Sequence, residues 1–217
     1  MVAIYLSPFL LSSYLPKASK VVKKYIMEIK KNFILSNTVA FIGLMGAGKT
    51  TLGRQFAKMI HVDFVDSDEE IVQRAGISIP EIFELSGEEK FRNIENRVIA
   101  DILKRAPVIL STGGGAFIST EIREMLNDTS VTIWLRTKPE TLLARMENLN
   151  NRPLLANGDP LLTLTNLYKE REPFYKKAHI VIDTDNLSTT QSLNILIKEL
   201  RDRKILRLKT SRFEDIK

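Results

Sequence analysis

The segment GLMGAGKTT, from Gly43 to Thr51, has the residue types and the spacing of a loop that binds nucleotide phosphates. Gly43, Gly48, Lys49 and Thr50 satisfy the pattern G-x-x-x-x-G-K-[ST] between a strand-like run and a run with helical spacing, the context that this motif requires. Lys49 would place a positive charge on the β- and γ-phosphates, and Thr50 would ligate Mg²⁺. The residues expected to contact the nucleotide here are Gly46, Ala47, Gly48, Lys49, Thr50 and Thr51. The segment predicts a site for a nucleoside triphosphate.

Two carboxylates follow the next strand-like run, VDFVD, in the order Asp66, Asp68. Residues two apart in an extended segment face the same way, so both are expected to point toward the phosphate loop. There they could hold Mg²⁺ through water and accept a proton from a substrate hydroxyl. The alternative is that one of them only caps the helix that begins at EEIVQ.

The segment STGGGAF, residues 111–117, places three glycines directly after the apolar run PVIL. Glycine loses more backbone freedom on folding than any other residue, so three together need a reason. One reason is close approach, because a ligand can reach main-chain N–H groups only where no Cβ intervenes. The alternative is a tight turn into the helix that follows.

Three arginines are candidates for binding anions. Arg92 and Glu95 are spaced i, i+3, so the carboxylate could aim the guanidinium, or the two could form an ordinary surface ion pair. Arg152 lies in NRPLLANGDP, which we interpret as a mobile lid over about 148–161 that brings charge to the transferring phosphoryl group; an exposed loop is the alternative. Arg171 lies in EREPFY, where a solvent-facing role is the default.

The elements that must position these residues alternate between strand and helix. The predicted strands are 38–42, 62–66, 107–110, 130–135 and 178–183, and the predicted helices are 52–60, one that begins at EEIVQ (69–73), 78–85, 88–106, 120–127, 139–148, 161–178 and 189–204. Ser78 with Glu81 predicts a capped start for the helix at 78–85, and Gly87 predicts its end. This alternation predicts an α/β fold of three layers, a five-stranded parallel sheet with helices on both faces. Ligands of such sheets bind at the carboxyl ends of the strands. We divide the chain into an N-terminal extension, 1–35, one domain, 36–204, and a basic C-terminal tail, 205–217.

Composition limits the classes of function. The chain has 217 residues, no cysteine and a net charge of +6. Residues 1–35 carry about +5 and residues 198–217 about +4, so the body between them is acidic. Without cysteine there is no disulfide and no thiolate metal site, which fits a reducing compartment. The apolar start lacks a basic n-region and is broken by prolines, so we expect neither an export signal nor a membrane span.

Taken together and in order, the motifs resemble the shikimate kinase family, a branch of the nucleoside-monophosphate-kinase-like P-loop proteins. The resemblance runs from about Asn37 to about Asn194 and rests on GLMGAGKTT, DSD, FRNIE, STGGG, NRPLL and EREPFY. It implies a P-loop fold with strand order 2-3-1-4-5. It also implies roles for single residues: shikimate binding for Asp68, Arg92, Gly113, Gly114, Gly115 and Arg171, adenine stacking for Arg145, Mg²⁺ for Asp66 with Thr50, and catalysis for Lys49, Asp68 and Arg152.

The activity that the resemblance implies is transfer of the γ-phosphoryl group of MgATP to the 3-hydroxyl of shikimate, a step toward chorismate and the aromatic amino acids. A gluconate kinase-type enzyme for sugar acids is the alternative. A nucleic-acid-dependent ATPase that uses the basic ends is a more distant one, since the ends lack a glycine–aromatic RNA-binding pattern. We expect a cytoplasmic monomer with small-molecule substrates and neither a nucleic-acid nor a membrane partner.

Overall fold

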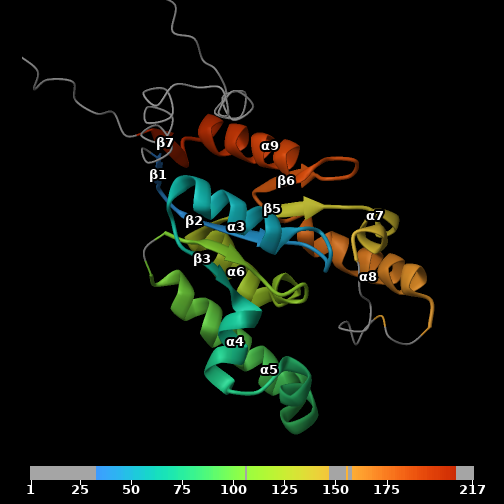
Figure 1. Cartoon of the computed structure of the whole chain (residues 1–217). Helices are drawn as coiled ribbons and strands as arrows, with labels where there is room; N and C mark the ends of the chain where they lie inside the picture. Colours follow the sequence, from blue (N-terminus) through green and yellow to red (C-terminus); the bar gives the residue numbers. More distant parts are fainter. Residues whose placement is uncertain (1–32, 106, 147–154, 156–157, 209–217) are drawn as a thin grey trace, which may run out of the picture.

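The computed structural model describes residues 33–105, 107–146, 155 and 158–208, and within them a five-stranded sheet forms the centre (Figure 1). Its strands, in chain order, are β2 Thr38–Ile42, β3 Phe64–Asp66, β4 Ile109–Ser111, β5 Ser130–Arg136 and β6 Ile180–Asp183. Every neighbouring pair is parallel, and the spatial order is β3-β4-β2-β5-β6. Counted within this sheet, that is 2-3-1-4-5, so the predicted sheet and strand order are confirmed.

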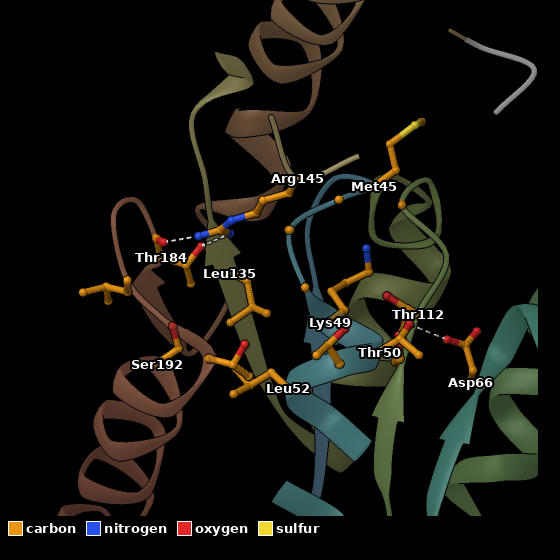
Figure 2. A pocket seen from close by; sticks show the side chains of 18 of the residues that line it. Met45, Lys49, Thr50, Leu52, Asp66, Thr112, Leu135, Arg145, Thr184 and Ser192 are labelled. Carbon is orange, nitrogen blue, oxygen red and sulfur yellow. Dashed lines mark hydrogen bonds between the residues drawn. The ribbon is translucent and has the colours of Figure 1, made fainter. Parts of the chain in front are cut away.

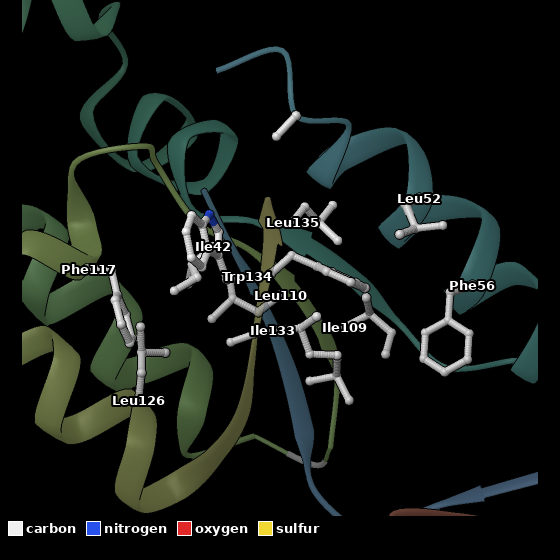
Figure 3. Packing of buried hydrophobic residues seen from close by; sticks show 14 of the residues in the cluster. Ile42, Leu52, Phe56, Ile109, Leu110, Phe117, Leu126, Ile133, Trp134 and Leu135 are labelled. Carbon is white, nitrogen blue, oxygen red and sulfur yellow. The ribbon is translucent and has the colours of Figure 1, made fainter. Parts of the chain in front are cut away.

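The strands form because apolar and β-branched residues run continuously through them. All five residues of β2 are buried, as expected for a strand covered on both faces. Figure 3 shows the two covering layers: Leu52 and Phe56 lie on one side of the strands, and Phe117 and Leu126 lie on the other. Because all five strands run the same way, their carboxyl ends meet at one edge, where a ligand would bind.

Seven helices and one short 3-10 turn connect and cover these strands in the described residues. The helices are α3 Lys49–Ile60, α4 Ser67–Ala75, α5 Ile79–Leu103, α6 Thr120–Thr129, α7 Pro139–Ala144, α8 Pro160–Tyr175 and α9 Thr189–Asp202, with the turn η2 at Ala116–Ile118. In Figure 1, α4 and α5 together project beyond the sheet.

The predicted helix start at Ser78 is confirmed by a capping box. The Ser78 side chain accepts from the N–H of Glu81, and the Glu81 carboxylate accepts from the N–H of Ser78. The predicted break at Gly87 is a kink within α5, since this residue has a φ of 75° and a ψ of 172°. That conformation favours glycine.

A second, antiparallel pair of strands lies away from the main sheet and was not predicted. It joins β1, Phe33–Leu35, to β7, Leu206–Leu208. Both strands lie just outside the predicted domain limits of 36 and 204. Phe33, Leu35 and Leu206 are buried, so the pair adds to the core. The division into extension, domain and tail stays a proposal, and the described fold includes residues on the outer side of both limits.

Candidate functional site

The predicted phosphate loop lies between β2 and α3. Gly43, Gly46 and Gly48 have φ values of 133°, 78° and 90°, a region that side chains with a Cβ rarely adopt. The loop therefore requires glycine at these three positions. The ammonium group of Lys49 donates hydrogen bonds to the carbonyl oxygens of Gly43, at 2.8 Å, and Leu44, at 3.0 Å. These contacts hold Lys49 inside the curve of the loop.

A cavity of about 510 Å³ opens at this loop, at the carboxyl end of the sheet (Figure 2). All six predicted loop residues line it: Gly46, Ala47, Gly48, Lys49, Thr50 and Thr51. In Figure 2, Lys49 and Thr50 lie between Arg145 on one side and Asp66 on the other. The cavity thus extends in both directions from the position expected for the phosphates.

Arg145 lines one end of the cavity. It is the residue after α7, and its guanidinium donates to the hydroxyl of Thr184, at 3.2 Å, and to the carbonyl oxygen of the same residue. The guanidinium is therefore held at the cavity wall by the segment after β6. The contact of Arg145 with adenine remains a prediction, and the place of its guanidinium at the cavity wall favours it.

Thr50 and Asp66 meet at the other end. The Thr50 hydroxyl donates to Oδ2 of Asp66 at 2.9 Å, and the Ser111 hydroxyl lies 3.4 Å from the Thr50 hydroxyl. Thr50 lies in the first turn of α3, Asp66 ends β3 and Ser111 ends β4, so three elements supply oxygen atoms to one point. Within the described part of the chain no group of three or more His, Cys, Asp or Glu side chains could hold a metal. A hydroxyl and a carboxylate next to bound phosphates fit Mg²⁺, which keeps waters and takes few protein ligands.

The argument that placed Asp66 and Asp68 on one face of an extended segment was wrong. The chain turns into α4 at Ser67, so Asp66 is the N-cap and Asp68 lies in the first turn of the helix. Asp66 does cap the helix, accepting from the N–H of Asp68 at 3.1 Å, and it also accepts from Thr50. Both carboxylates nevertheless line the cavity.

Asp68 lies in an environment that resists ionisation. Burial raises the pKa of its carboxyl above the ordinary 3.8, the charge of Asp66 raises it further, and Lys49 and Arg92 oppose the rise. A carboxylate with a raised pKa is a better proton acceptor than one in water. The position therefore suits a group that orients or deprotonates a hydroxyl.

The glycine run faces three charged side chains. A Cβ on Gly113 would lie 2.7 Å from Oδ1 of Asp68, one on Gly114 would lie 3.6 Å from a terminal nitrogen of Arg171, and one on Gly115 would lie 2.7 Å from a terminal nitrogen of Arg92. A turn does run through them, with the N–H of Ala116 donating to the carbonyl oxygen of Gly113, but none of the three glycines has a positive φ, so the turn does not require glycine. A Cβ at 113 or 115 would therefore displace the charged end of the side chain that faces it, Asp68 or Arg92.

One part of the close-approach argument needs correction. The N–H of Gly113 does not stand free for a ligand, because it donates to the Ser67 hydroxyl at 3.1 Å. Sequence analysis assigned no role to Ser67, which lies between Asp66 and Asp68. Of the three glycines, Gly114 alone is among the residues that line the cavity.

Arg92 is aimed by a buried carboxylate. Its guanidinium donates to Glu95 at 2.7 Å, and Glu95 is only 1% exposed. The predicted pairing is confirmed, and the alternative of an ordinary surface ion pair is wrong because one partner is buried. Burial raises the pKa of Glu95, while Arg92 counters that rise.

Arg171 reaches the site from α8. Its Nε atom is buried and has no hydrogen-bond partner in the described part of the chain. A buried donor without a partner costs free energy, so a ligand that accepts from it would be favoured. The solvent-facing reading of Arg171 is therefore wrong. Arg152 and most of the predicted lid, 148–161, lie outside the described residues.

The fold and the site together define a P-loop kinase: a phosphate loop between a strand and a helix of a parallel α/β sheet, with a hydroxyl–carboxylate pair beside it. No helix in the described residues is long and apolar enough to cross a membrane.

Comparison with known proteins narrows this class. A family model described as shikimate kinase matches residues 45–201. The shikimate kinase of Ruegeria pomeroyi is 44% identical over 171 residues, covering 78% of this chain and 88% of that protein. The shikimate kinase of Burkholderia thailandensis is 44% identical over 163 residues, covering 75% and 89%. The solved structure of shikimate kinase from Acinetobacter baumannii in complex with shikimate has a TM-score of 0.71 and 38% identity, covering 77% of this chain and 94% of that one. The chain belongs to the shikimate kinase family.

Proposed function

We propose that this chain transfers the γ-phosphoryl group of MgATP to the 3-hydroxyl of shikimate, giving shikimate 3-phosphate. The observation that carries the proposal is the glycine run, whose three members successively face Asp68, Arg171 and Arg92. Two guanidinium groups and one carboxylate face the glycine run, and they are chemically complementary to a small acid that carries hydroxyl groups. The carboxylate of shikimate would pair with the arginines, and its ring hydroxyls would face Asp68.

The reaction depends mainly on positioning and charge. Phosphoryl transfer needs little covalent chemistry from the protein, so holding the reactants in line and stabilising negative charge contribute most. Lys49 and Arg152 would stabilise the charge on the transferring group. Asp68 would orient the 3-hydroxyl or accept its proton.

Thr50 and Asp66 are the residues that would hold Mg²⁺, Thr50 directly and Asp66 through water. When bound, the ion would neutralise charge on the β- and γ-phosphates. Asp66 holds the Thr50 hydroxyl in place for that role. Arg145 would lie against adenine at the other end of the cavity.

Gluconate kinase activity is the weaker alternative. The family match supports shikimate, and no contact in the described site favours an open-chain sugar acid. The test is to measure ADP formation with shikimate and gluconate side by side. Turnover with shikimate and none with gluconate is expected, and the reverse preference would overturn the proposal. A monomeric state and a cytoplasmic location remain part of the proposal.

A further inference from the structure

Two buried side chains from different helices form hydrogen bonds with the backbone of the glycine run. The Ser67 hydroxyl accepts from the N–H of Gly113 at 3.1 Å, and the Tyr175 hydroxyl donates to the carbonyl oxygen of Gly114. Ser67 is completely buried, and Tyr175 is 1% exposed.

Each hydroxyl belongs to an element that also carries a charged residue of the site. Ser67 is the first residue of α4, directly before Asp68. Tyr175 ends α8 one turn after Arg171, and residues spaced i, i+4 lie on the same helix face. The hydroxyl of Ser67 therefore ties Gly113 to the backbone that carries Asp68, and that of Tyr175 ties Gly114 to the face that carries Arg171.

The backbone of the glycine run lies so close to the side chains of Asp68 and Arg171 that it has little room to move. A Cβ added at Gly113 would already overlap Asp68, and one at Gly114 would be in van der Waals contact with Arg171. A small shift of the glycine backbone would change the distances from the ring of a bound substrate to both side chains. Displacements of about 1 Å can lower the rate of an enzyme by about a hundredfold.

Packing alone does not require these hydroxyls. The ring of Tyr175 contacts Trp134 at 5.8 Å between centroids, a contact that phenylalanine would keep. Burial raises the pKa of Tyr175 to about 12, although the Arg171 guanidinium beside it opposes the rise. The phenol therefore stays protonated near neutral pH and remains a donor to Gly114.

We propose that Ser67 and Tyr175 are positioning residues that fix the glycine run relative to Asp68 and Arg171. A substrate hydroxyl would then be held next to Asp68 while the substrate carboxylate is held next to Arg171. This proposal rests on the proposed phosphorylation of shikimate. Neither residue would touch the substrate. Their effects would differ, because Ser67 acts through Asp68 and Tyr175 acts through Arg171.

The test compares Ser67→Ala and Tyr175→Phe with matched controls. Tyr168→Phe is the control on the same helix, since Tyr168 also contacts Trp134, at 6.3 Å between centroids. Ser130→Ala is the serine control. Ser130 is buried, and its hydroxyl donates to the carbonyl oxygen of Leu126. It is the first residue of β5, so it lies at the end of the sheet away from the glycine run. Steady-state kinetics for both substrates and melting temperatures would be measured for all four variants.

The expected result is a split between the two kinetic constants. Tyr175→Phe should raise the KM for shikimate, and Ser67→Ala should lower kcat, each by about threefold to tenfold, the range for one lost hydrogen bond. The KM for ATP and both controls should stay within about twofold, since remote changes are usually small. Isothermal titration calorimetry with shikimate should show weaker binding to Tyr175→Phe than to Tyr168→Phe.

Three outcomes would overturn the proposal separately from the function. If wild type phosphorylates shikimate and the two variants match their controls, the positioning role is wrong. The same holds if the variants lose only melting temperature, or if the constants for both substrates change equally. A wild-type chain that neither binds nor phosphorylates shikimate would overturn the proposed function, and the positioning role with it.

Discussion

The hydroxyl of Thr50 donates a hydrogen bond to Oδ2 of Asp66 at 2.9 Å, joining the start of α3 to the end of the edge strand β3. The strand β3 does not neighbour β2, which leads into the phosphate loop; β4 lies between them. The hydrogen bond therefore passes across the carboxyl end of β4, next to the position expected for the phosphates. It brings together the two residues that we propose for Mg²⁺.

Asp66→Asn tests that assignment. Asparagine keeps the size of the side chain and can still cap α4, but it removes the negative charge. We expect the Mg²⁺ concentration for half-maximal activity to rise by about tenfold or more, as for loss of a hydrogen bond to a charged group. Asp63→Asn is the control, because Asp63 is exposed and does not line the cavity. An unchanged Mg²⁺ dependence in Asp66→Asn would leave Asp66 as a helix cap only.

Asp68→Asn should lower turnover while sparing nucleotide binding. If Asp68 orients or deprotonates the substrate hydroxyl, kcat should fall by about a hundredfold or more. Binding of ATP, measured by calorimetry without shikimate, should not be lost, because Asp68 lies in α4 and not in the phosphate loop. Turnover close to wild type would exclude a role in the chemical step.

The same substitution should stabilise the fold at neutral and alkaline pH. Burial raises the pKa of Asp68 above 3.8, so the folded chain binds this proton more tightly than the unfolded chain. The resulting stability is complete below 3.8 and is lost as pH rises through the raised pKa. Asparagine never ionises and avoids that loss. The melting temperature of Asp68→Asn should therefore exceed that of wild type at pH 8, and the difference should shrink as pH falls; a difference that grows toward acid pH would contradict this.

Arg92→Lys should affect the acid substrate alone. Lysine keeps the charge but loses the planar fork that can bind a carboxylate through two hydrogen bonds. The KM for shikimate should rise by about fivefold or more, with the KM for ATP unchanged. Arg97→Lys is the matched control, an exposed arginine on the same helix. A rise in the KM for ATP would mean that Arg92 does not serve the acid substrate.

Gly115→Ala should reproduce the Arg92 effect without touching Arg92. The new Cβ would lie 2.7 Å from one terminal nitrogen of Arg92 and 3.0 Å from the other. The end of a long side chain can move, so the chain should fold with a melting temperature near wild type. The displaced guanidinium should raise the KM for shikimate as Arg92→Lys does. Wild-type kinetics in a folded Gly115→Ala chain would show that the position of the Arg92 guanidinium next to Gly115 is not needed for activity.

Sequence reasoning succeeded where the deciding residues are neighbours in the chain. The phosphate loop, the Ser78–Glu81 capping box and the Arg92–Glu95 pair each lie within a few residues, and local geometry fixes what they can contact. The strands of the main sheet were predictable because they are short apolar runs between helical segments. The strand order came from the family resemblance.

The remaining features depend on contacts between distant segments. Nothing near Ser67 or Tyr175 in sequence shows that their hydroxyls meet the glycine run. The strands β1 and β7 are three residues each and pair across almost the whole chain. The extended reading of Asp66 and Asp68 failed because α4 begins between them. The burial of Glu95 also emerges only when α5 packs in the fold.

Identification of the product tests the central claim most directly. The chain would be incubated with MgATP and shikimate, and the phosphorylated product examined by ³¹P and ¹H NMR. We predict one phosphate ester whose phosphorus couples to the ring proton at carbon 3, formed together with an equal amount of ADP. An ester at another hydroxyl, or ADP released at the same rate with and without shikimate, would contradict the account.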